Sequence, residues 1–215
     1  MLVYMDILTI ASQKGGAGKT TLSAHLAVEA ERQGYGSVAV IDTDPQGSLA
    51  DWWNQRRAET PMFAAVEVVR LAAHMAELRQ QQVNLVVIDT PPALIQTIRA
   101  VIGVATLVLI PARPSPHDLR AVGVIVEMAE AAKIPFCFVV NGATPRTTIA
   151  LQAVQALAQH GPVAPVIVHQ RVDFAGSMTD GRTTSEVHPH SRSADEITQL
   201  WIYVSTQLRK YGRSP

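Results

Sequence analysis

Apolar residues occur along this chain in two alternating patterns. Short runs that are apolar at nearly every position, such as residues 7–11 and 85–88, alternate with longer stretches in which apolar residues recur every three or four positions. The first pattern is typical of strands buried in a parallel sheet, and the second of helices that pack along one side. Because they alternate to the end of the chain, we expect an α/β fold: a three-layer, doubly wound, mostly parallel sheet with helices on both faces.

The two patterns place strands and helices in regular succession. The expected strands cover residues 6–12, 37–42, 65–69, 85–89, 106–110, 136–141 and 163–168. The expected helices cover residues 20–33, 49–57, 72–81, 119–132, 148–160 and 194–210. The chain has 215 residues and no linker long enough to divide it, so residues 1–215 are expected to form one domain.

A glycine-rich segment, QKGGAGKTT at residues 13–21, connects the first expected strand to the first expected helix. Such a turn leaves several backbone N–H groups pointing into one concavity, and the positive end of the helix dipole adds to their field. The segment is therefore expected to bind phosphate. Lys19 is placed to carry a positive charge to the β- and γ-phosphates of a nucleotide, and the Thr20 hydroxyl suits Mg²⁺.

Carboxylates follow two of the apolar strands. Asp42 and Asp44 lie at the end of one strand, and Asp89 lies at the end of another. Ligands of open α/β sheets bind at the carboxyl ends of the strands, so we expect these side chains to meet the phosphate site. One carboxylate of the first pair can hold the water shell of a metal ion while the other orients an attacking water, and Asp89 is expected to hold Mg²⁺.

The glycine-rich segment departs from the common pattern G-x-x-x-x-G-K-[ST] in two ways. Gln13 replaces the first glycine, and a second lysine, Lys14, precedes the double glycine. The run KGGAGKTT resembles the deviant Walker A box of the ParA/MinD family of ATPases. The resemblance implies a P-loop NTPase fold, ATP and Mg²⁺ as cofactors, and a Lys14 that reaches across a dimer interface to the partner's nucleotide. The residues that it implies in nucleotide binding are Gly15, Gly16, Ala17, Gly18, Lys19, Thr20 and Thr21.

Two further boxes are similar to the same family, in the same chain order. The run DTDPQ is similar to its Walker A′ box, whose second aspartate is tied to hydrolysis, and this role would belong to Asp44. The run LVVID is similar to its Walker B box. The implied catalytic residues are then Lys14, Lys19 and Asp44, and the implied Mg²⁺ site consists of Thr20, Asp42 and Asp89.

The sequence also indicates which nucleotide base the site would bind. The chain has no Asn-Lys-x-Asp signature of the kind that selects guanine, because no asparagine is followed by lysine. Asn141 ends the strand at 136–141, where the family places an asparagine that contacts adenine. Adenine is therefore the expected base.

The resemblance extends to small plasmid-partition ATPases of the ParF type. It rests on DTDPQGSLADWW at residues 42–53, on residues 111–118 and on residues 170–186. In that group a proline-rich segment belongs to the subunit interface. From the residues alone, 111–118 is equally well a stiff turn in which Ser115 or Asp118 caps the next helix.

The resemblance implies a function in DNA partition. A homodimer with ATP sandwiched between its subunits would gate non-specific DNA binding, hydrolyse Mg-ATP slowly and respond to a centromere-binding or adaptor protein of the ParB or ParG kind. Eighteen basic and eighteen acidic residues leave no net charge, so DNA contacts would depend on local patches. One such patch is the basic C-terminal end, with Arg209, Lys210 and Arg213.

Two alternatives remain within the same superfamily. A MinD-like membrane ATPase would need a C-terminal amphipathic helix free to enter the bilayer surface, and a stripe of Ile197, Leu200, Trp201, Val204 and Leu208 has the required spacing. A metabolic ATP-dependent ligase of the dethiobiotin synthetase type would need a small-molecule carboxylate site. Iron–sulfur relatives are excluded because the chain has one cysteine.

With no membrane span or signal peptide evident, we expect a cytoplasmic protein, nucleoid-associated when ATP is bound.

Overall fold

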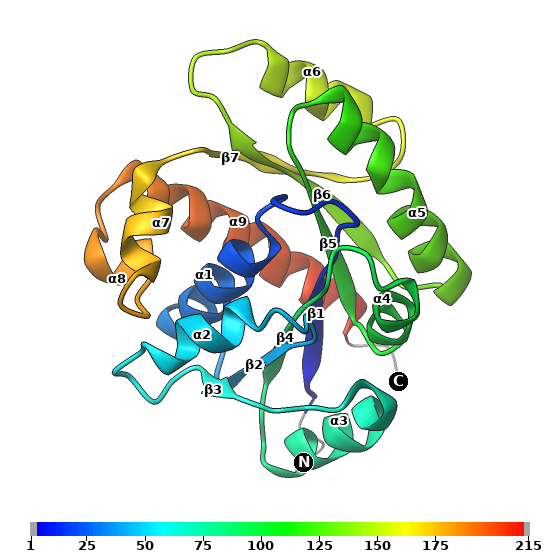
Figure 1. The fold of residues 1–215 in the computed structure, drawn as a ribbon, viewed down its shortest axis with the longest axis vertical. Helices are drawn as coiled ribbons and strands as arrows, with labels where there is room; N and C mark the ends of the chain where they lie inside the picture. The colour runs from blue at the N-terminus through cyan, green and yellow to red at the C-terminus, as the bar shows by residue number, and fades with distance from the viewer. Residues whose placement is uncertain (1–3, 213–215) are drawn as a thin grey trace.

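The structure is a computed structural model that describes residues 4–212. Within this range, seven strands form one sheet in the order β3-β2-β4-β1-β5-β6-β7 (Figure 1). Every neighbouring pair is parallel. The strands are β1 (Asp6–Ile10), β2 (Val38–Asp42), β3 (Met62–Phe63), β4 (Leu85–Asp89), β5 (Leu107–Ala112), β6 (Phe136–Ala143) and β7 (Val163–His169).

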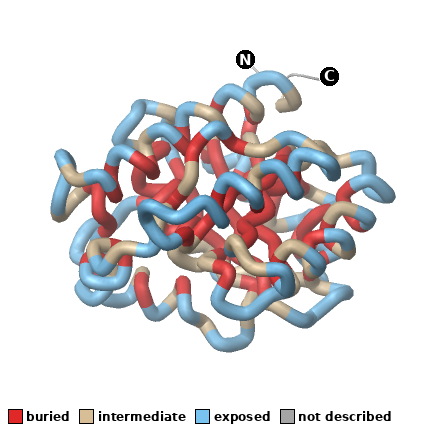
Figure 2. Tube along the Cα trace, turned by 90° about the horizontal axis from the view of Figure 1, so that it is seen from above, coloured by how far each residue is buried: buried red, intermediate tan, exposed pale blue. Residues whose placement is uncertain are grey.

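Helices cover both faces of this sheet, as the sequence predicts. One face carries α1 (Lys19–Arg32), α2 (Ser48–Asn54), α7 (Val172–Met178), α8 (Thr184–Val187) and α9 (Arg192–Tyr211). The other carries α3 (Leu71–Gln80), α4 (Ile95–Ile102), α5 (Pro116–Ala132) and α6 (Ile149–Leu157). Figure 2 shows the buried positions gathered between the layers and the exposed ones outside.

The central strands are apolar at nearly every position because both of their faces are covered. In β4, Leu85 and Val87 pack on the side of α1 and α9, whereas Val86 and Ile88 pack on the side of α3. All four side chains are completely buried. This arrangement gives continuous apolar runs instead of alternating ones.

The third strand lies elsewhere than predicted. The expected strand at 65–69 is wrong: β3 is Met62–Phe63, and a 3₁₀ turn covers Val68–Arg70. Val69 is 91% exposed, so the apolar residues of this segment are not sheet core. An edge strand with two pairing residues depends on the path of the chain against β2 more than on its own composition.

Three helices are absent from the sequence prediction. They are α4, which follows the Pro91-Pro92 turn, and the short α7 and α8. The last two have seven and four residues, and helices this short depend on tertiary contacts for their stability. The sixth strand also continues beyond its expected end, to Ala143.

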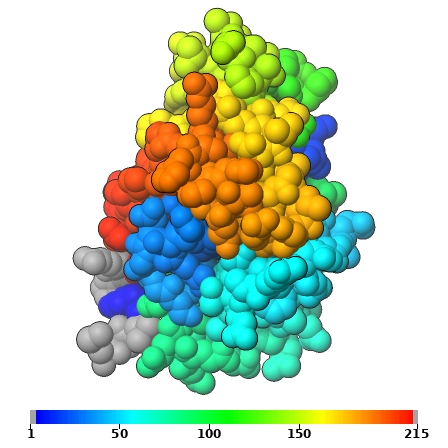
Figure 3. All heavy atoms as spheres, turned by 90° about the vertical axis from the view of Figure 1, so that its left-hand side faces the viewer, coloured from blue at the N-terminus to red at the C-terminus, as the bar shows by residue number. Residues whose placement is uncertain are grey.

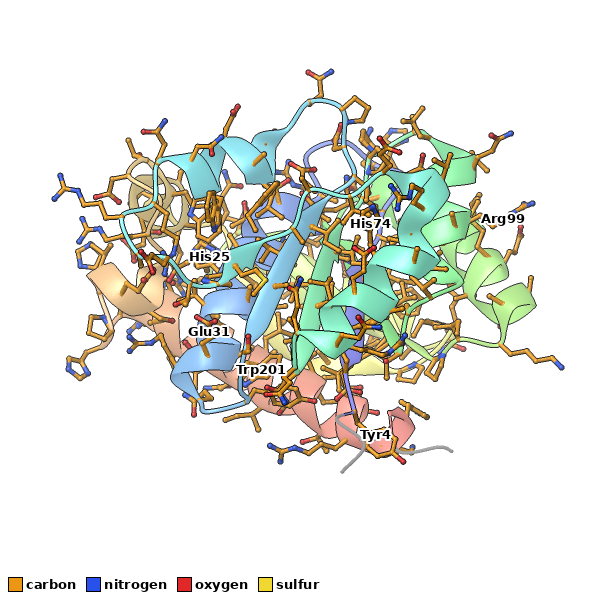
Figure 4. The ribbon with its side chains drawn as sticks, turned by 90° about the horizontal axis from the view of Figure 1, so that it is seen from below. Tyr4, His25, Glu31, His74, Arg99 and Trp201 are labelled. Atoms are coloured by element: carbon orange, nitrogen blue, oxygen red, sulfur yellow. The ribbon has the colours of Figure 1, made fainter. Side chains whose placement is uncertain are left out.

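The C-terminal helix packs on its own sheet. The residues of its apolar stripe are at most 2% exposed, and Trp201, labelled in Figure 4, meets Tyr35 edge to face at 5.1 Å. This stripe is therefore not free to enter a bilayer surface. Within residues 4–212, none of the helices has both the length and the apolar character of a membrane span.

Candidate functional site: a nucleotide phosphate site

The predicted phosphate loop lies between the end of β1 at Ile10 and the start of α1 at Lys19. Gly16 and Gly18 have φ angles of 74° and 89°, in the left-handed region that favours glycine. A Cβ on Gly18 would lie 2.1 Å from Nδ2 of Asn141, so the loop and β6 approach each other too closely for a side chain. No side chain caps the start of α1, and its first N–H groups remain available to an anion.

Lys19 lies at the centre of this loop. Lys19 is 7% exposed, and its Nζ donates a hydrogen bond to the carbonyl oxygen of Lys14 at 3.5 Å. Burial lowers the pKa of Lys19 below its usual range, whereas the negative charges of Asp89 and Asp44 oppose that change. The ammonium group is thus confined where a phosphate would lie.

Asp89 ends β4 and faces the first turn of α1. It is 1% exposed, and its Oδ2 accepts a hydrogen bond from the Thr20 hydroxyl at 2.6 Å. Its Oδ1 is buried and has no hydrogen-bond partner among the described residues. Burial raises the pKa of Asp89 to about 7, and nearby Asp42 adds to the effect. An unpartnered buried carboxylate oxygen beside a hydroxyl fits a magnesium ion, for which oxygen ligands are preferred.

Asp42 ends the neighbouring strand and has different surroundings. Its Oδ1 accepts the N–H of Asp44 at 2.9 Å, and its Oδ2 accepts the N–H groups of Leu49 and Ala50 at 2.9 and 3.1 Å. Asp42 therefore organises the turn into α2. Its role in Mg²⁺ binding stays a prediction, as does the catalytic role of Asp44, whose Oδ1 accepts the N–H of Gln46.

Two threonine hydroxyls join the strand ends beneath the site. Thr43 donates to the carbonyl oxygen of Asp89 at 2.7 Å, and Thr90 donates to that of Ile10 at 2.9 Å. Both hydroxyls are buried. They fix the ends of β1, β2 and β4 relative to one another, so the carboxylates and the phosphate loop share one rigid edge.

Within the described residues, no cluster of three His, Cys, Asp or Glu side chains could hold a metal ion without help. Proteins commonly bind Mg²⁺ through one or two carboxylates together with substrate phosphates. Here Thr20 and Asp89 would hold the ion with the nucleotide. When bound, Mg²⁺ would neutralise charge on the phosphates.

Asn141 lies inside β6 and contacts the loop directly. Its Nδ2 donates to the carbonyl oxygen of Ala17 at 2.7 Å. An apolar pocket of about 480 Å³ lies just beyond, after the ends of β6 and β7. Its lining residues are Thr144, Pro145, Gln170, Arg171, Val172 and Ala175. The contact of Asn141 with a base stays a prediction, because the structure shows the residue supporting the phosphate loop.

Lys14 differs from Lys19 in orientation and exposure. Its backbone N–H donates to Oγ of Ser12 at 3.3 Å, while the residue as a whole is exposed. Within the described residues its ammonium group has no hydrogen-bond or ion-pair partner. It is therefore available to a second molecule, although its action across an interface stays a prediction.

Side chains of Trp52 and Arg56 connect α2 to the segment around α8, and their contacts are called the clamp below. Arg56 donates to the carbonyl oxygen of Gly181 at 2.7 Å and to the carboxylate of Glu186 at 2.7 and 3.0 Å. Trp52 donates to the carbonyl oxygen of Arg182 at 3.1 Å. In Figure 3 the α7–α8 region, in orange, lies against the α2 region, in cyan. The sequence holds no signal for this clamp.

His25 joins the phosphate-loop helix to the same segment. Its Nδ1 lies 2.8 Å from the carbonyl oxygen of Thr21, and its Nε2 accepts the N–H of Thr184 at 3.2 Å. Burial lowers the pKa of His25 to about 4, so the ring is neutral at pH 7. No sequence signal marks His25, because a histidine in a helix has no local signature.

Comparison with known proteins agrees with this geometry. The family described as the CobQ/CobB/MinD/ParA nucleotide binding domain matches residues 8–184. Maintenance of carboxysome distribution protein A from Halothiobacillus neapolitanus is 30% identical over 90% of this chain and 93% of its own length. The chromosome-partitioning ATPase Soj from Thermus thermophilus is 24% identical over 94% of this chain and 96% of its own.

A solved structure gives the same result for the fold. The septum site-determining protein MinD from Pyrococcus horikoshii, complexed with Mg-ADP, superposes with a TM-score of 0.80 and 16% identity, covering 98% of this chain and 100% of that one. The chain belongs to the CobQ/CobB/MinD/ParA family. It is a deviant Walker A ATPase of the ParA type, and the geometry of its site fits ATP and Mg²⁺ as cofactors.

Proposed function

We propose that this chain is a partition or positioning ATPase: an ATP-dependent homodimer that binds DNA without sequence preference and distributes a cargo through slow hydrolysis. The observation that carries the proposal is the pair of lysines at the phosphate loop. Lys19 is buried and confined, whereas Lys14 is exposed and its ammonium group has no hydrogen-bond or ion-pair partner within the described residues. One lysine serves its own subunit, and the other is available to a second subunit.

The relatives support a positioning function. One relative is named for carboxysome distribution and another for chromosome partitioning, and both align over most of their length with this chain. A large protein assembly and a DNA molecule are different cargoes. The activity proposed for this chain, ATP-driven positioning, would serve either kind of cargo, and an adaptor of the ParB or ParG kind would connect it to the cargo.

The dimer is tested with Lys14→Ala in an Asp44→Ala background, which we expect to trap ATP. The double variant should bind one ATP per monomer and remain monomeric in light scattering, whereas Asp44→Ala alone should dimerise. Lys133→Asn is a matched control, because it also removes one lysine, and asparagine tolerates the φ angle of 57° at that position. An ATP-dependent dimer of the Lys14 variant would exclude the proposed role.

DNA binding is proposed for the end of α9. Arg209 and Lys210 are exposed, and their charged groups lie over the rings of Tyr35 at 5.9 Å and Tyr211 at 4.9 Å. Arg213, the third expected contact, lies outside the described residues. Stacked cations on one edge can contact phosphates of DNA, and a dimer would double their number.

The gating is tested by measuring affinity for unrelated DNA duplexes with and without ATP and Mg²⁺. Binding should require ATP and weaken with salt, with a log–log slope of about −0.9 for each neutralised phosphate. Arg209→Glu with Lys210→Glu should weaken binding and leave turnover without DNA unchanged. Arg99→Glu serves as the control, since Figure 4 shows Arg99 directed away from the molecule on α4. Equal affinity of nucleotide-free and ATP-bound protein would contradict the gating.

A further inference from the structure

Arg113 follows β5 in a turn that leaves its backbone little freedom. Pro111 lies within β5, and Pro114 and Pro116 follow Arg113, with φ fixed at each. Ser115 caps α5 by accepting the N–H of Asp118 at 3.2 Å, and its own N–H donates to the carbonyl oxygen of Arg113 at 2.7 Å. The backbone position from which the Arg113 side chain extends is therefore well fixed.

The side chain passes Gly142 of β6 and ends beside Gly16 of the phosphate loop. Its Nε lies 3.4 Å from the place that a Cβ on Gly142 would take, and its Nη2 lies 4.0 Å from the place of a Cβ on Gly16. Both positions are glycines with left-handed φ angles, 66° and 74°. The guanidinium thus lies beside the loop that is expected to hold the phosphates.

Nothing in the described part of the chain neutralises this guanidinium. It has neither a hydrogen-bond partner nor an ion-pair partner there, and the residue is exposed. By contrast, Arg56, Arg171 and Arg182 each pair with a carboxylate at 2.5 to 2.7 Å. An unpaired arginine beside a loop that already presents N–H groups to an anion strengthens the same positive field.

We propose that Arg113 is, after Lys19, a second cationic residue of the phosphate site. It would bind oxygen atoms of the polyphosphate chain of ATP or ADP in its own subunit. The planar guanidinium offers several N–H donors in a fixed arrangement, which suits a phosphate group with more than one free oxygen. This role is distinct from that of Lys14, which is proposed to act on the partner's nucleotide. It rests on the ATPase activity of the chain and not on DNA binding or on a cargo.

The test is the affinity of the nucleotide-free protein for ADP, which is not expected to cause dimerisation, and separately for ATP, both measured by calorimetry. Arg113→Ala should weaken both nucleotides about tenfold or more, the usual loss for one charge-assisted hydrogen bond. Arg113→Lys should recover part of the affinity, because it restores the charge without the planar donors. Arg120→Ala, which removes an exposed arginine from the nearby helix α5, should stay within about twofold of the parent. The dependence of ADP affinity on salt should also become shallower in Arg113→Ala.

Three results would overturn the proposal. Parental affinity of Arg113→Ala for ADP and ATP would exclude a phosphate contact. If Arg113→Ala binds ADP normally and fails only to form the ATP-trapped dimer, Arg113 would belong to the subunit interface instead. An equal fall in melting temperature with and without nucleotide would show that the side chain only supports the fold.

Discussion

The carboxyl ends of β2 and β4 differ sharply although they lie side by side. Asp42 pairs in register with Asp89, and each aspartate ends its strand. Asp42 is half-buried, and its two oxygens accept three backbone N–H groups. Asp89 is 1% exposed and accepts one hydroxyl, while its second oxygen has no partner among the described residues. The first carboxylate is satisfied by the protein, and the second is not.

The comparison shows that one sheet edge can hold two carboxylates with very different hydrogen bonding. Burying a carboxylate without hydrogen bonds costs free energy, and an unpaired group of this kind persists where function requires it. Asp42 stabilises the turn that carries Asp44 and begins α2. Among the described residues, Asp89 leaves one buried oxygen without a hydrogen bond, which would be available to Mg²⁺ and lowers the stability of the nucleotide-free protein. Substitutions at the two positions should therefore have opposite effects.

Asp89→Asn is expected to have a large effect on turnover and an opposite effect on stability. Turnover of Mg-ATP should fall about 10²-fold or more, because metal stabilisation of the phosphates contributes several kcal/mol. The nucleotide-free variant should be at least as stable as the parent at pH 8, since it no longer buries a charge. ATPase assays and urea unfolding measure the two quantities. A less stable variant at pH 8 would contradict the assignment of Asp89 as a strained metal ligand.

Asp44→Ala should keep ATP affinity and lose turnover by roughly 10²- to 10⁴-fold, the range for a positioned proton-transfer group. If the parent hydrolyses ATP slowly, the lower figure applies. Lys19→Ala is the contrasting variant, because it should lose measurable ATP binding itself. Single-turnover hydrolysis and equilibrium binding separate the two. A parental rate in Asp44→Ala would move the hydrolytic role to another residue.

The pH dependence of stability should show two opposite contributions. The pKa of Asp89 is raised from 3.8 to about 7, so the folded state keeps its proton while the unfolded state loses it, and this contribution falls as pH rises from about 4 to 7. The pKa of His25 is lowered from 6.5 to about 4, so the unfolded state takes up a proton first, and stability is lost as pH falls from 6.5 to 4. Each slope is at most about 1.4 kcal/mol per pH unit.

The two contributions are separated by substitution. Urea unfolding of nucleotide-free Asp89→Asn should show stability rising more steeply with pH between 4 and 6.5 than in the parent. His25→Asn should lose the His25 contribution and show stability falling with pH relative to the parent. If the dependence of unfolding free energy on pH were the same in both variants as in the parent, the pKa values of Asp89 and His25 would not be shifted by burial.

The smallest effect is expected for Asp42→Asn. The amide keeps one acceptor oxygen and presents N–H groups where the carboxylate accepted them, so unfolding free energy should fall by about 1–3 kcal/mol. Asp51→Asn, an exposed change on α2, should cost less than about 1 kcal/mol. Both are measured by urea unfolding. Equal losses in the two variants would remove the contrast between Asp42 and an ordinary surface aspartate.

By itself, the sequence determined the layers of the fold and the place of the site. Apolar runs predicted six of the seven strands, and in the central ones burial on both faces leaves few polar positions. The glycine-rich segment and Asp42, Asp44 and Asp89 were expected at one edge, since the carboxyl ends of parallel strands meet there. Of the two residues considered as the cap of the helix after residues 111–118, Ser115 takes this role.

Only the tertiary structure decided which groups meet across long separations. It placed Arg113 beside Gly16, joined His25 to Thr184 across 159 positions of sequence, and left one oxygen of Asp89 unpartnered while satisfying Asp42. It also moved the edge strand β3 and formed α4, α7 and α8. Local patterns report which face of an element is buried, whereas partners at long range depend on how whole layers pack, and no short segment encodes that packing.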